Sequence, residues 1–380
     1  MRVAHIESGR HLYGGGAEVR YLVGGLAAAR VDNVLLCAAG GELAERCPEA
    51  QVVALPMAGD LDLSLIARAR RALRAVKPDI VHVHSRRGAD LYGGVAAALE
   101  GIPAIVTRRV DSPEPALWAR LKYRLYARVV ALSRTIEAQL VGCGLARDKV
   151  VRIPSAVDTG RFRPEPSARA RLLEAFALPA DALVVGVVAQ LIARKRHEWL
   201  LEELPELVRR DPRIRVLCFG RGPLEERLRA AVAARGLERF VVLAGFRDDL
   251  AELLPGLDLL AHPAEREGLG VALLEAASCG VAVVAAAAGG VLDVIEHGRT
   301  GVLVAHDDAL AFAGALARLL GNPLERAALG ADARADMQHR FSIQAMVGAH
   351  LHLYSAVLCE PAAAEAARRA TAREPRETPR

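Results

Sequence analysis

Residues 265–290 have the sequence EREGLGVALLEAASCGVAVVAAAAGG, in which a polar segment leads into a helix and then a strand. Strong helix formers occupy residues 271–277, and the Cys-Gly pair at 279–280 ends that run. Residues 281–284 are then predicted to form a short buried strand. A loop, a helix and a strand in this order are the repeating unit of an α/β fold.

The loop before this helix has the features of a phosphate site. Gly268 and Gly270, on either side of Leu269, lack a Cβ, so a ligand can approach the backbone closely. The helix that follows from Val271 leaves the amides of its first turn unpaired and carries the positive end of its dipole there. An anion is stabilised at such a position, and we expect a phosphate.

Two carboxylates flank this loop, Glu267 before it and Glu275 within the helix. Glu275 lies about 7–8 Å along the helix axis from Gly270. A diphosphate on the free amides would therefore place a ribose near Glu275 and a sugar near Glu267. On these residues alone, a surface glutamate followed by an ordinary helix is an equally good interpretation.

Length and composition indicate a two-domain α/β protein. The chain has 380 residues, which is more than one typical core supports. Its six cysteines are scattered without metal-ligand spacing, so we expect reduced thiols and no metal site. No apolar stretch reaches the roughly 18–20 residues of a membrane span, and the N-terminus does not resemble a signal peptide. We therefore expect a cytoplasmic protein.

The charge is uneven along the chain. Residues 1–155 contain 22 Lys and Arg against 15 Asp and Glu, whereas the remainder contains 28 against 30. A basic half beside a nearly neutral half indicates an anionic partner on one side. Aromatic residues make up only 4% of the chain, which disfavours nucleic acid because bases need rings to stack on. Membrane lipid or an anionic acceptor is favoured instead.

Strand and helix patterns alternate in the first half. Strands are predicted at residues 3–8, 34–37, 52–55, 80–83, 104–107, 129–132 and 150–153, with helices at 17–29, 62–76, 88–99, 115–127 and 134–142. This alternation predicts a doubly wound parallel sheet in a domain spanning residues 1–155.

The alternation restarts after a Pro-rich, charged linker with one short helix at residues 154–182. Strands are predicted at residues 183–189, 215–219, 241–244, 258–261, 281–284 and 301–304. Residues 156–340 thus form a second Rossmann-like domain, and the two domains are expected to face a cleft. A last helix is predicted at residues 341–358, capped by Ser342, and residues 359–380 are predicted to be a disordered tail.

The glycines at residues 9–16 raise the possibility of a dinucleotide dehydrogenase. Their spacing is not G-x-G-x-x-G, and residues 36–40 (LCAAG) lack the acidic residue expected after the second strand. We therefore reject NAD binding. A backbone loop that approaches a phosphate or a sugar and a plain flexible turn both remain open.

Short motifs occur in a fixed order along the chain. They are Gly15-Gly16-Ala17-Glu18, PDIVHVH at residues 78–84, Lys195, FGRGPL at 219–224, Gly245-Phe246, the Glu267 and Glu275 pair, GGVLDVI at 289–295 and GVLV at 301–304. In this order the chain resembles the family 4 retaining glycosyltransferases of GT-B fold, from residue 1 to about 358. Residues 84–90, 107–111 and 189–195 are similar to proteobacterial members thought to act on lipopolysaccharide and related envelope glycans.

The resemblance implies a fold and an activity. A GT-B protein has two Rossmann-like domains facing a cleft and a C-terminal helix that crosses back to the first. The family transfers a sugar from a nucleotide diphosphate donor with retention of configuration, and it requires neither a metal nor a cofactor.

The resemblance also assigns roles. Lys195 and Glu267 would be catalytic, with Lys195 meeting the charge of the leaving diphosphate. Donor binding is assigned to Glu275, Gly268, Leu269, Gly270, Val271, Gly15, Gly16, Phe246, Arg247 and Gln190.

Three positions depart from the family pattern. Gln190 occupies the place of an arginine that most members have, and Arg194 or Arg196 would be the replacement cation. Arg109 occupies the place of a histidine near the acceptor, and Ser155-Ala156 replaces an Asn-Gly pair at the domain junction.

Acceptor-side candidates follow the ends of two predicted parallel strands, the edge where such sheets bind ligands. They are His84, Arg86, Arg87, Arg108 and Arg109. Solvated charge is the usual role of an arginine, but four at strand ends favour an anion site. His82 and His84 alternate along their strand, which we interpret as one in the core and one in the cleft.

The predicted helix at 115–127 has one apolar face, formed by Trp118, Leu121, Leu125 and Tyr126, and several basic residues. Core packing is the simplest explanation for this face. A membrane-surface helix is the alternative.

These observations predict a sugar transferase at the inner face of the cytoplasmic membrane. Its donor would be a nucleotide sugar, UDP-linked in our expectation, and its acceptor an anionic envelope glycolipid or glycan such as lipopolysaccharide core. Transfer to a small soluble acceptor and sugar-nucleotide binding without turnover are the alternatives. A glycoside hydrolase would place both carboxylates across one bond, whereas here they are assigned to opposite ends of a long ligand.

Overall fold

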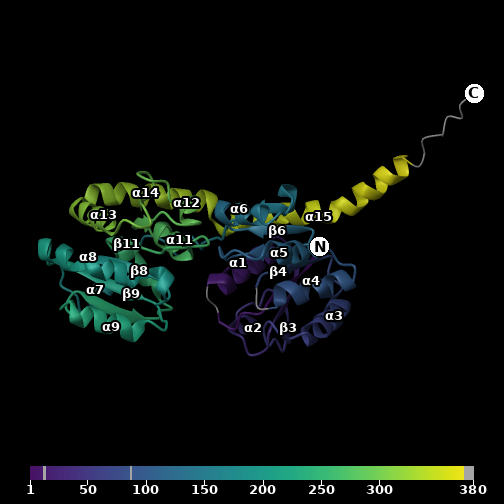
Figure 1. Cartoon of the computed structure of the whole chain (residues 1–380), viewed down its shortest axis with the longest axis horizontal. Helices are drawn as coiled ribbons and strands as arrows, with labels where there is room; N and C mark the ends of the chain where they lie inside the picture. Colours follow the sequence, from purple (N-terminus) through teal and green to yellow (C-terminus); the bar gives the residue numbers. More distant parts are fainter. Residues whose placement is uncertain (12–13, 86–87, 372–380) are drawn as a thin grey trace, which may run out of the picture.

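The computed structural model describes residues 1–11, 14–85 and 88–371, with side chains up to Cys359. Arg86 and Arg87, two of the acceptor-side candidates, therefore lie outside the described residues. Figure 1 shows two lobes side by side, with the last helix lying over the first lobe. The N-terminal lobe consists of residues up to Ser155 together with this last helix, and the C-terminal lobe spans residues 156–340.

The N-terminal lobe contains a parallel sheet of order β3-β2-β1-β4-β5-β6-β7 within the described residues. Its strands are β1 (Arg2–Glu7), β2 (Asp32–Ala38), β3 (Gln51–Leu55), β4 (Ile80–Val83), β5 (Ala104–Arg108), β6 (Arg128–Ala131) and β7 (Val150–Arg152). The strand order reverses between β1 and β4, and such a switch point opens a crevice at the carboxyl ends of the strands.

The C-terminal lobe repeats this plan with the order β10-β9-β8-β11-β12-β13 among the described strands. Its strands are β8 (Leu183–Val188), β9 (Ile214–Phe219), β10 (Val241–Gly245), β11 (Leu259–His262), β12 (Ala282–Ala286) and β13 (Val302–Val304). The switch point lies between β8 and β11. The predicted Rossmann-like architecture is thus confirmed in both halves.

Helices connect the strands in both lobes. Those of the first half are α1 (Gly14–Ala28), α2 (Glu42–Glu45), α3 (Ser64–Val76), α4 (Ala89–Leu99), α5 (Ala116–Tyr123) and α6 (Arg134–Gly142). Those of the second half are α7 (Ala168–Ala175), α8 (His197–Arg210), α9 (Glu225–Ala234), α10 (Leu250–Leu253), α11 (Val271–Ser278), α12 (Val291–Val294), α13 (Ala309–Gly321) and α14 (Pro323–Arg340). Short 3-10 turns occur at η1 (Arg147–Lys149), η2 (Ala193–Lys195) and η3 (Leu254–Gly256).

The last helix, α15 (Ile343–Thr371), returns to the N-terminal lobe. Its buried side chains Met346, Val347 and Tyr354 pack in one cluster with Leu22 and Leu26 of α1. The predicted crossing is therefore confirmed. The helix also continues past Leu358, into residues that we had predicted to be disordered, because alanine, glutamate and arginine are strong helix formers.

The chain passes between the lobes at two neighbouring places. The Val157 amide donates a hydrogen bond to the Phe341 carbonyl at 2.8 Å, and Val157 forms a bridge with Ser342. The outward and returning segments are thus joined where they leave the N-terminal lobe.

Helix α5 corrects one interpretation of the sequence. Tyr126 is buried, but Trp118 and Leu121 are 43% and 57% exposed, so they do not pack in the core. The buried face of α5 is instead formed by Ala119, Lys122 and Tyr123. Periodicity alone favoured the larger apolar residues, whereas the lysine is buried because it is ion-paired. Among the described residues, no helix is both long and apolar enough to cross a membrane.

Candidate active site

The loop before α11 is held in a defined shape by backbone contacts. Gly270 has φ +96°, a left-handed conformation that favours glycine. The Gly290 amide donates to the Glu267 carbonyl at 2.8 Å, and a Cβ on Gly290 would lie only 2.1 Å from the Gly268 carbonyl oxygen. The Gly289-Gly290 pair is thus required because the two backbones are in direct contact.

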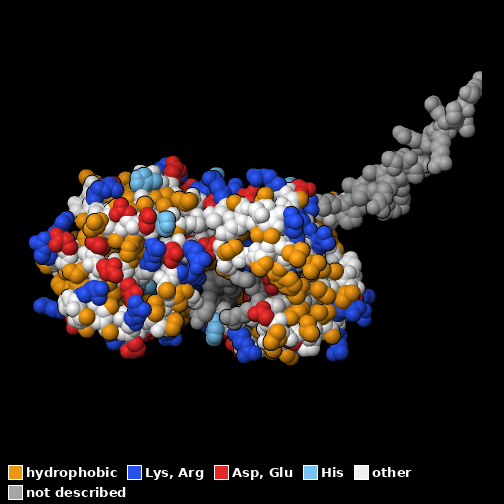
Figure 2. Space-filling view, viewed as in Figure 1, with side chains coloured by type: hydrophobic (Ala, Val, Ile, Leu, Met, Phe, Trp, Pro, Cys, Tyr) orange, Lys and Arg blue, Asp and Glu red, His pale blue; other side chains and the backbone are white. Residues whose placement is uncertain are grey.

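The first turns of α1 and α11 meet across the space between the lobes. A Cβ on Gly14 would lie 3.4 Å from the Val271 side chain, and one on Gly268 would lie 2.4 Å from the Arg109 carbonyl oxygen. Two helix N-termini, with their free amides and positive dipole ends, therefore approach one point. Figure 2 shows that the surface is hollowed between the lobes. This convergence suits a diphosphate.

Lys195 and Glu267 form a buried ion pair at the switch point of the C-terminal sheet. His262, at the end of β11, lies 3.0 Å from the same carboxylate oxygen. Burial would raise the pKa of Glu267, but His262 and Lys195 outweigh it and hold the pKa below its usual range. Burial lowers the pKa of His262, so its ring is neutral. Glu267 is therefore an ionised acceptor fixed from two sides.

Glu275 has a different environment. It is half-buried in the second turn of α11, and burial raises its pKa to about 7. Arg161 of the linker acts in the opposite direction. Burial raises the pKa of Tyr21 in α1, and the Glu275 charge raises it further. The carboxyl group therefore faces both the linker and the N-terminal lobe. Near neutral pH it is available to accept hydrogen bonds from ligand hydroxyls.

The remaining donor-side candidates lie at the carboxyl ends of β8 and β10. Gln190 is exposed directly after β8, and Phe246 is 49% exposed after β10. The Arg221 guanidinium lies 5.8 Å from the Phe246 ring, which gives a base a surface to stack on. Arg247 is ion-paired with Asp249. The order of the strands separates this ring from Lys195 along the sheet edge.

Neither Arg194 nor Arg196 replaces the arginine that most family members have at the position of Gln190. Arg194 donates to the Arg266 carbonyl at 3.2 Å. Arg196 donates to the His306 carbonyl and lies 3.8 Å from Glu265. Lys195 is therefore the cation of this segment that pairs with the Glu267 carboxylate.

Arg109 is ion-paired inside the N-terminal lobe. Its guanidinium pairs with Glu18, which also accepts a hydrogen bond from Ser155 at the domain junction. Its side chain also lies beside Gly15, whose Cβ position is 3.6 Å from the Arg109 Cδ. Arg109 thus joins α1 to the acceptor side, and its charge is already paired rather than open to an acceptor anion.

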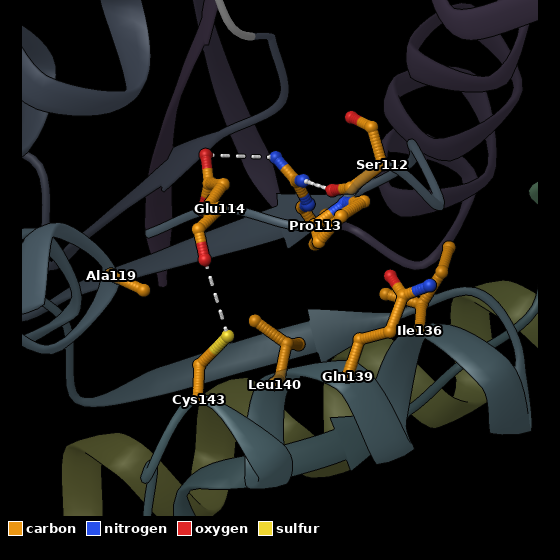
Figure 3. Close-up of a pocket in the computed structure, with 9 residues that line it drawn as sticks. Ser112, Pro113, Glu114, Ala119, Ile136, Gln139, Leu140 and Cys143 are labelled. Carbon is orange, nitrogen blue, oxygen red and sulfur yellow. Dashed lines mark hydrogen bonds and ion pairs between the residues drawn. The ribbon is translucent and has the colours of Figure 1, made fainter. Parts of the chain in front are cut away.

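Arg108 is also not an open anion site. It is only 5% exposed and pairs with Glu114 at 3.0 Å. Figure 3 shows Glu114 beside Ser112, with Ala119 of α5 and Cys143, directly after α6, lining the same small pocket. The predicted arginine cluster is therefore corrected for both Arg108 and Arg109: strand-end position was right, but acidic neighbours from later in the fold neutralise both charges.

His84 belongs to a buried histidine network. His82 of β4 and His84, directly after the strand, lie on the same side, as the two-residue period of a strand requires, and both are buried. Our interpretation of one in the cleft was therefore wrong. Arginine only donates, so Arg109 Nη2, at 3.3 Å, donates to His84 Nδ1. His84 then donates from Nε2 to His5 Nδ1 at 2.9 Å, and His5 donates to Asn33 at 3.1 Å.

The three histidines His5, His82 and His84 place ring nitrogens within 4.8 Å of one another, a spacing that suits a cation. The directed hydrogen bonds explain the cluster better. His82 contacts Tyr354 and Thr107 at 2.8 and 2.7 Å, so its ring nitrogens are also occupied. The adjacent Arg109 charge disfavours a metal ion. We assign the cluster to hydrogen bonding.

Comparisons with known proteins agree with this geometry. The model "Glycosyltransferase Family 4" matches residues 14–161, and "Glycosyl transferases group 1" matches residues 182–322. A D-inositol 3-phosphate glycosyltransferase of Saccharomonospora viridis is 31% identical over 304 residues, covering 73% of this chain and 69% of that protein. The chain belongs to the family 4 glycosyltransferases.

Other relatives of this glycosyltransferase share parts of its length. A GDP-mannose-dependent alpha-(1-6)-phosphatidylinositol monomannoside mannosyltransferase of Mycolicibacterium smegmatis is 38% identical over 193 residues. The match covers 48% of this chain and 50% of that protein, so the chain spans about half the length of this relative. These relatives are actinobacterial and do not support the narrower resemblance to the lipopolysaccharide branch.

The solved structures confirm the GT-B fold. Anabaena Alr3699/HepE in complex with UDP and glucose superposes on the glycosyltransferase with a TM-score of 0.82. The superposition covers 94% of this chain and 100% of that chain at 21% identity.

Sequence reasoning missed several residues of the site. His262 and Arg221 were present in strand-end segments, and this position was the signal that could have identified them. Tyr21 had no signal, because its proximity to Glu275 depends on how the lobes are placed. Arg161 had none either, because the path of the linker past Glu275 is set by the tertiary fold. Glu18 was quoted within a motif, but its pairing with Arg109 was not predictable from spacing.

Proposed function

We propose that the glycosyltransferase transfers a sugar from a nucleotide diphosphate sugar to a phosphorylated polyol or glycolipid. The observation that carries this proposal is the convergence of the α1 and α11 N-termini beside Lys195 and Glu267. Free amides and the lysine would bind the diphosphate, while the fixed Glu267 carboxylate accepts hydrogen bonds from the sugar.

In this proposal no metal ion is needed. Charge grows on the leaving diphosphate as the glycosidic bond breaks, and the helix amides and Lys195 would stabilise it. We further propose retention of configuration, with Glu267 at the sugar and Glu275 at the ribose. The assembled Lys195–Glu267–His262 group argues against a protein that binds the donor without turnover.

The proposed acceptor carries phosphate. The names of the M. smegmatis and S. viridis relatives both refer to phosphorylated inositol, once in a lipid and once as a free compound. The basic surplus of residues 1–155 agrees with an anionic acceptor on the N-terminal lobe. Lipopolysaccharide core belongs to the same chemical class. We place the protein in the cytoplasm, at the inner face of the membrane.

A panel of nucleotide sugars tests the donor. GDP-mannose is the first candidate from the relatives, and UDP-glucose and UDP-galactose represent the UDP-linked donor expected from the sequence. We expect one donor class to raise the melting temperature and to be hydrolysed slowly in the absence of acceptor. If no nucleotide sugar stabilises the protein, or if EDTA abolishes turnover, the proposed donor chemistry is wrong.

The acceptor is tested with the donor that binds best. The assay has four arms, which are inositol 3-phosphate, a phosphatidylinositol glycolipid, a phosphorylated lipopolysaccharide core and the dephosphorylated counterparts. The NMR signal of the product's anomeric proton reports whether configuration is retained. We expect transfer to a phosphorylated acceptor at least tenfold faster than to its dephosphorylated form. Efficient transfer to a neutral soluble acceptor would establish the alternative of a small-acceptor enzyme.

A further inference from the structure

Helix α5 exposes three large apolar side chains on two turns. Leu117, Trp118 and Leu121 are 82%, 43% and 57% exposed. Single exposed apolar residues are ordinary, but a cluster of this kind marks an interaction surface. We call these three residues the apolar face of α5.

The opposite side of the helix fixes this orientation. Lys122 is buried and pairs with Asp90 at 2.8 Å and with Glu114 at 2.7 Å. Tyr123 donates to the second oxygen of Glu114 at 2.9 Å. Rotation of α5 to bury the apolar face would break this buried network, which is costly. The exposure is therefore built into the fold.

Two basic side chains lie next to the apolar face. Arg120 of α5 and Arg124, the residue directly after it, are both exposed, and within the parts of the chain that the structure describes neither has an ion-pair partner. We call Arg120 and Arg124 the basic rim. Apolar side chains flanked by positive charge are complementary to an anionic lipid surface.

The location also fits a membrane-bound acceptor. Helix α5 follows the segment that leaves the carboxyl end of β5, at the same sheet edge as the acceptor-side candidates. The loop after β3 ends at this edge too and exposes Leu61 and Leu63 at 94% and 69%. The Tyr92 hydroxyl of α4 donates to the Asp60 carbonyl and fixes this loop. Figure 2 shows apolar side chains gathered on the N-terminal lobe over α4 and the elements beside it.

We propose that the apolar face of α5 and its basic rim dock the N-terminal lobe on an anionic bilayer. Trp118 and the two leucines enter the interface while the arginines contact lipid phosphates. The proposal rests on the proposed function only for its purpose, the capture of a lipid-linked acceptor.

Sedimentation with vesicles tests the docking with the full chain. We expect binding to vesicles of equal parts phosphatidylcholine and phosphatidylglycerol, loss of binding to phosphatidylcholine alone, and weakening as salt rises. The triple variant Leu117→Ser/Trp118→Ser/Leu121→Ser and the variant Arg120→Gln/Arg124→Gln should each weaken binding at least tenfold.

Matched controls come from the C-terminal lobe. Leu310 and Leu324 are 75% and 83% exposed there, so Leu310→Ser/Leu324→Ser removes comparable apolar surface. Arg235→Gln/Arg239→Gln removes two exposed charges. Both controls should bind vesicles like the unaltered protein. Equal losses in the controls and in the α5 variants would overturn the proposal, as would absence of binding to anionic vesicles.

Two further readouts separate this proposal from the proposed function. Donor-induced thermal shift and transfer to a soluble acceptor should be unchanged in the α5 variants, because these residues lie outside the donor site. If donor binding fails in every protein while vesicle binding behaves as expected, only the proposed function is wrong. If the triple variant instead converts a dimer to a monomer without affecting vesicle binding, the face is a protein interface and the docking proposal fails.

Discussion

At the scale of single residues, Glu275 couples donor binding to a proton. Burial raises its pKa to about 7, so near neutrality the unliganded protein is a mixture of protonated and ionised forms. Ribose hydroxyls donate best to the ionised carboxylate, and donor binding should therefore release part of a proton at pH 7. Calorimetry in buffers of different ionisation enthalpy measures this release.

The variant Glu275→Gln makes the same residue testable without a donor. The native state keeps the proton up to about pH 7, while the unfolded chain releases it near 4.5. The stability that the protonated Glu275 carboxyl contributes to the native state is fully present below pH 4.5 and is lost as pH rises toward 7. Glu275→Gln should be more stable than the parent at pH 8 by up to about 3 kcal/mol and equal to it at pH 4, and proton release should vanish. A pH-independent difference would contradict the assignment.

Lys195 is expected to affect both turnover and stability. Lys195→Met should lower kcat at least a hundredfold, because the leaving-group charge loses its cation. It should also lower the free energy of unfolding by about 3–5 kcal/mol, because Glu267 keeps a buried charge without this partner. The double variant Lys195→Met/Glu267→Gln removes both charges. It should recover most of the stability and none of the turnover, and recovery of neither would mean that the pair is not coupled as described.

At the scale of the element, the loop before α11 depends on its glycine partner. Gly290→Ala would place a Cβ 2.1 Å from the Gly268 carbonyl oxygen, so the loop must move. Donor affinity should fall by about 1–3 kcal/mol, because the free amides no longer point at the diphosphate. Isothermal titration measures the loss. Gly314→Ala, at a helical glycine with open space around it, is the control and should leave affinity unchanged.

The elements were largely predictable, and the charge pairing was not. Every predicted strand is present, because buried parallel strands form short apolar runs between turn residues, as at Ile80–Val83. The loop and helix of α11 were predictable from local patterns, whereas the roles of Glu267 and Glu275 stay predictions. Arg108 and Arg109 were misjudged because the acidic partner of each guanidinium is set by the tertiary fold. Arg108 pairs with Glu114 of the following loop, and Arg109 pairs with Glu18 of helix α1. The same reason hid the exposed face of α5.

At the scale of the whole molecule, Gly268 limits how closely the lobes approach. A Cβ at this position would lie 2.4 Å from the Arg109 carbonyl oxygen of the opposite lobe. Gly268→Ala should therefore hold the lobes apart and lower kcat at least tenfold. Nucleotide-induced thermal shift should persist, because the proposed nucleotide contacts at Glu275 and Lys195 lie in the C-terminal lobe. Small-angle scattering with donor should show a larger radius of gyration than in Gly142→Ala, a control with open space. Equal radii of gyration and normal turnover would contradict the role of Gly268 in lobe closure.

The return of α15 has a consequence for the order of biosynthesis. The N-terminal lobe is translated first, yet its core includes Tyr354 and Val357, which are translated after the entire C-terminal lobe. At 5–20 residues per second, the ribosome needs about 10–40 s to travel from the first crossing to these residues. During this interval the side chains of Leu22 and Leu26 are not yet covered by α15, while the C-terminal lobe can already fold. The first half of the protein to emerge is thus the last to be completed.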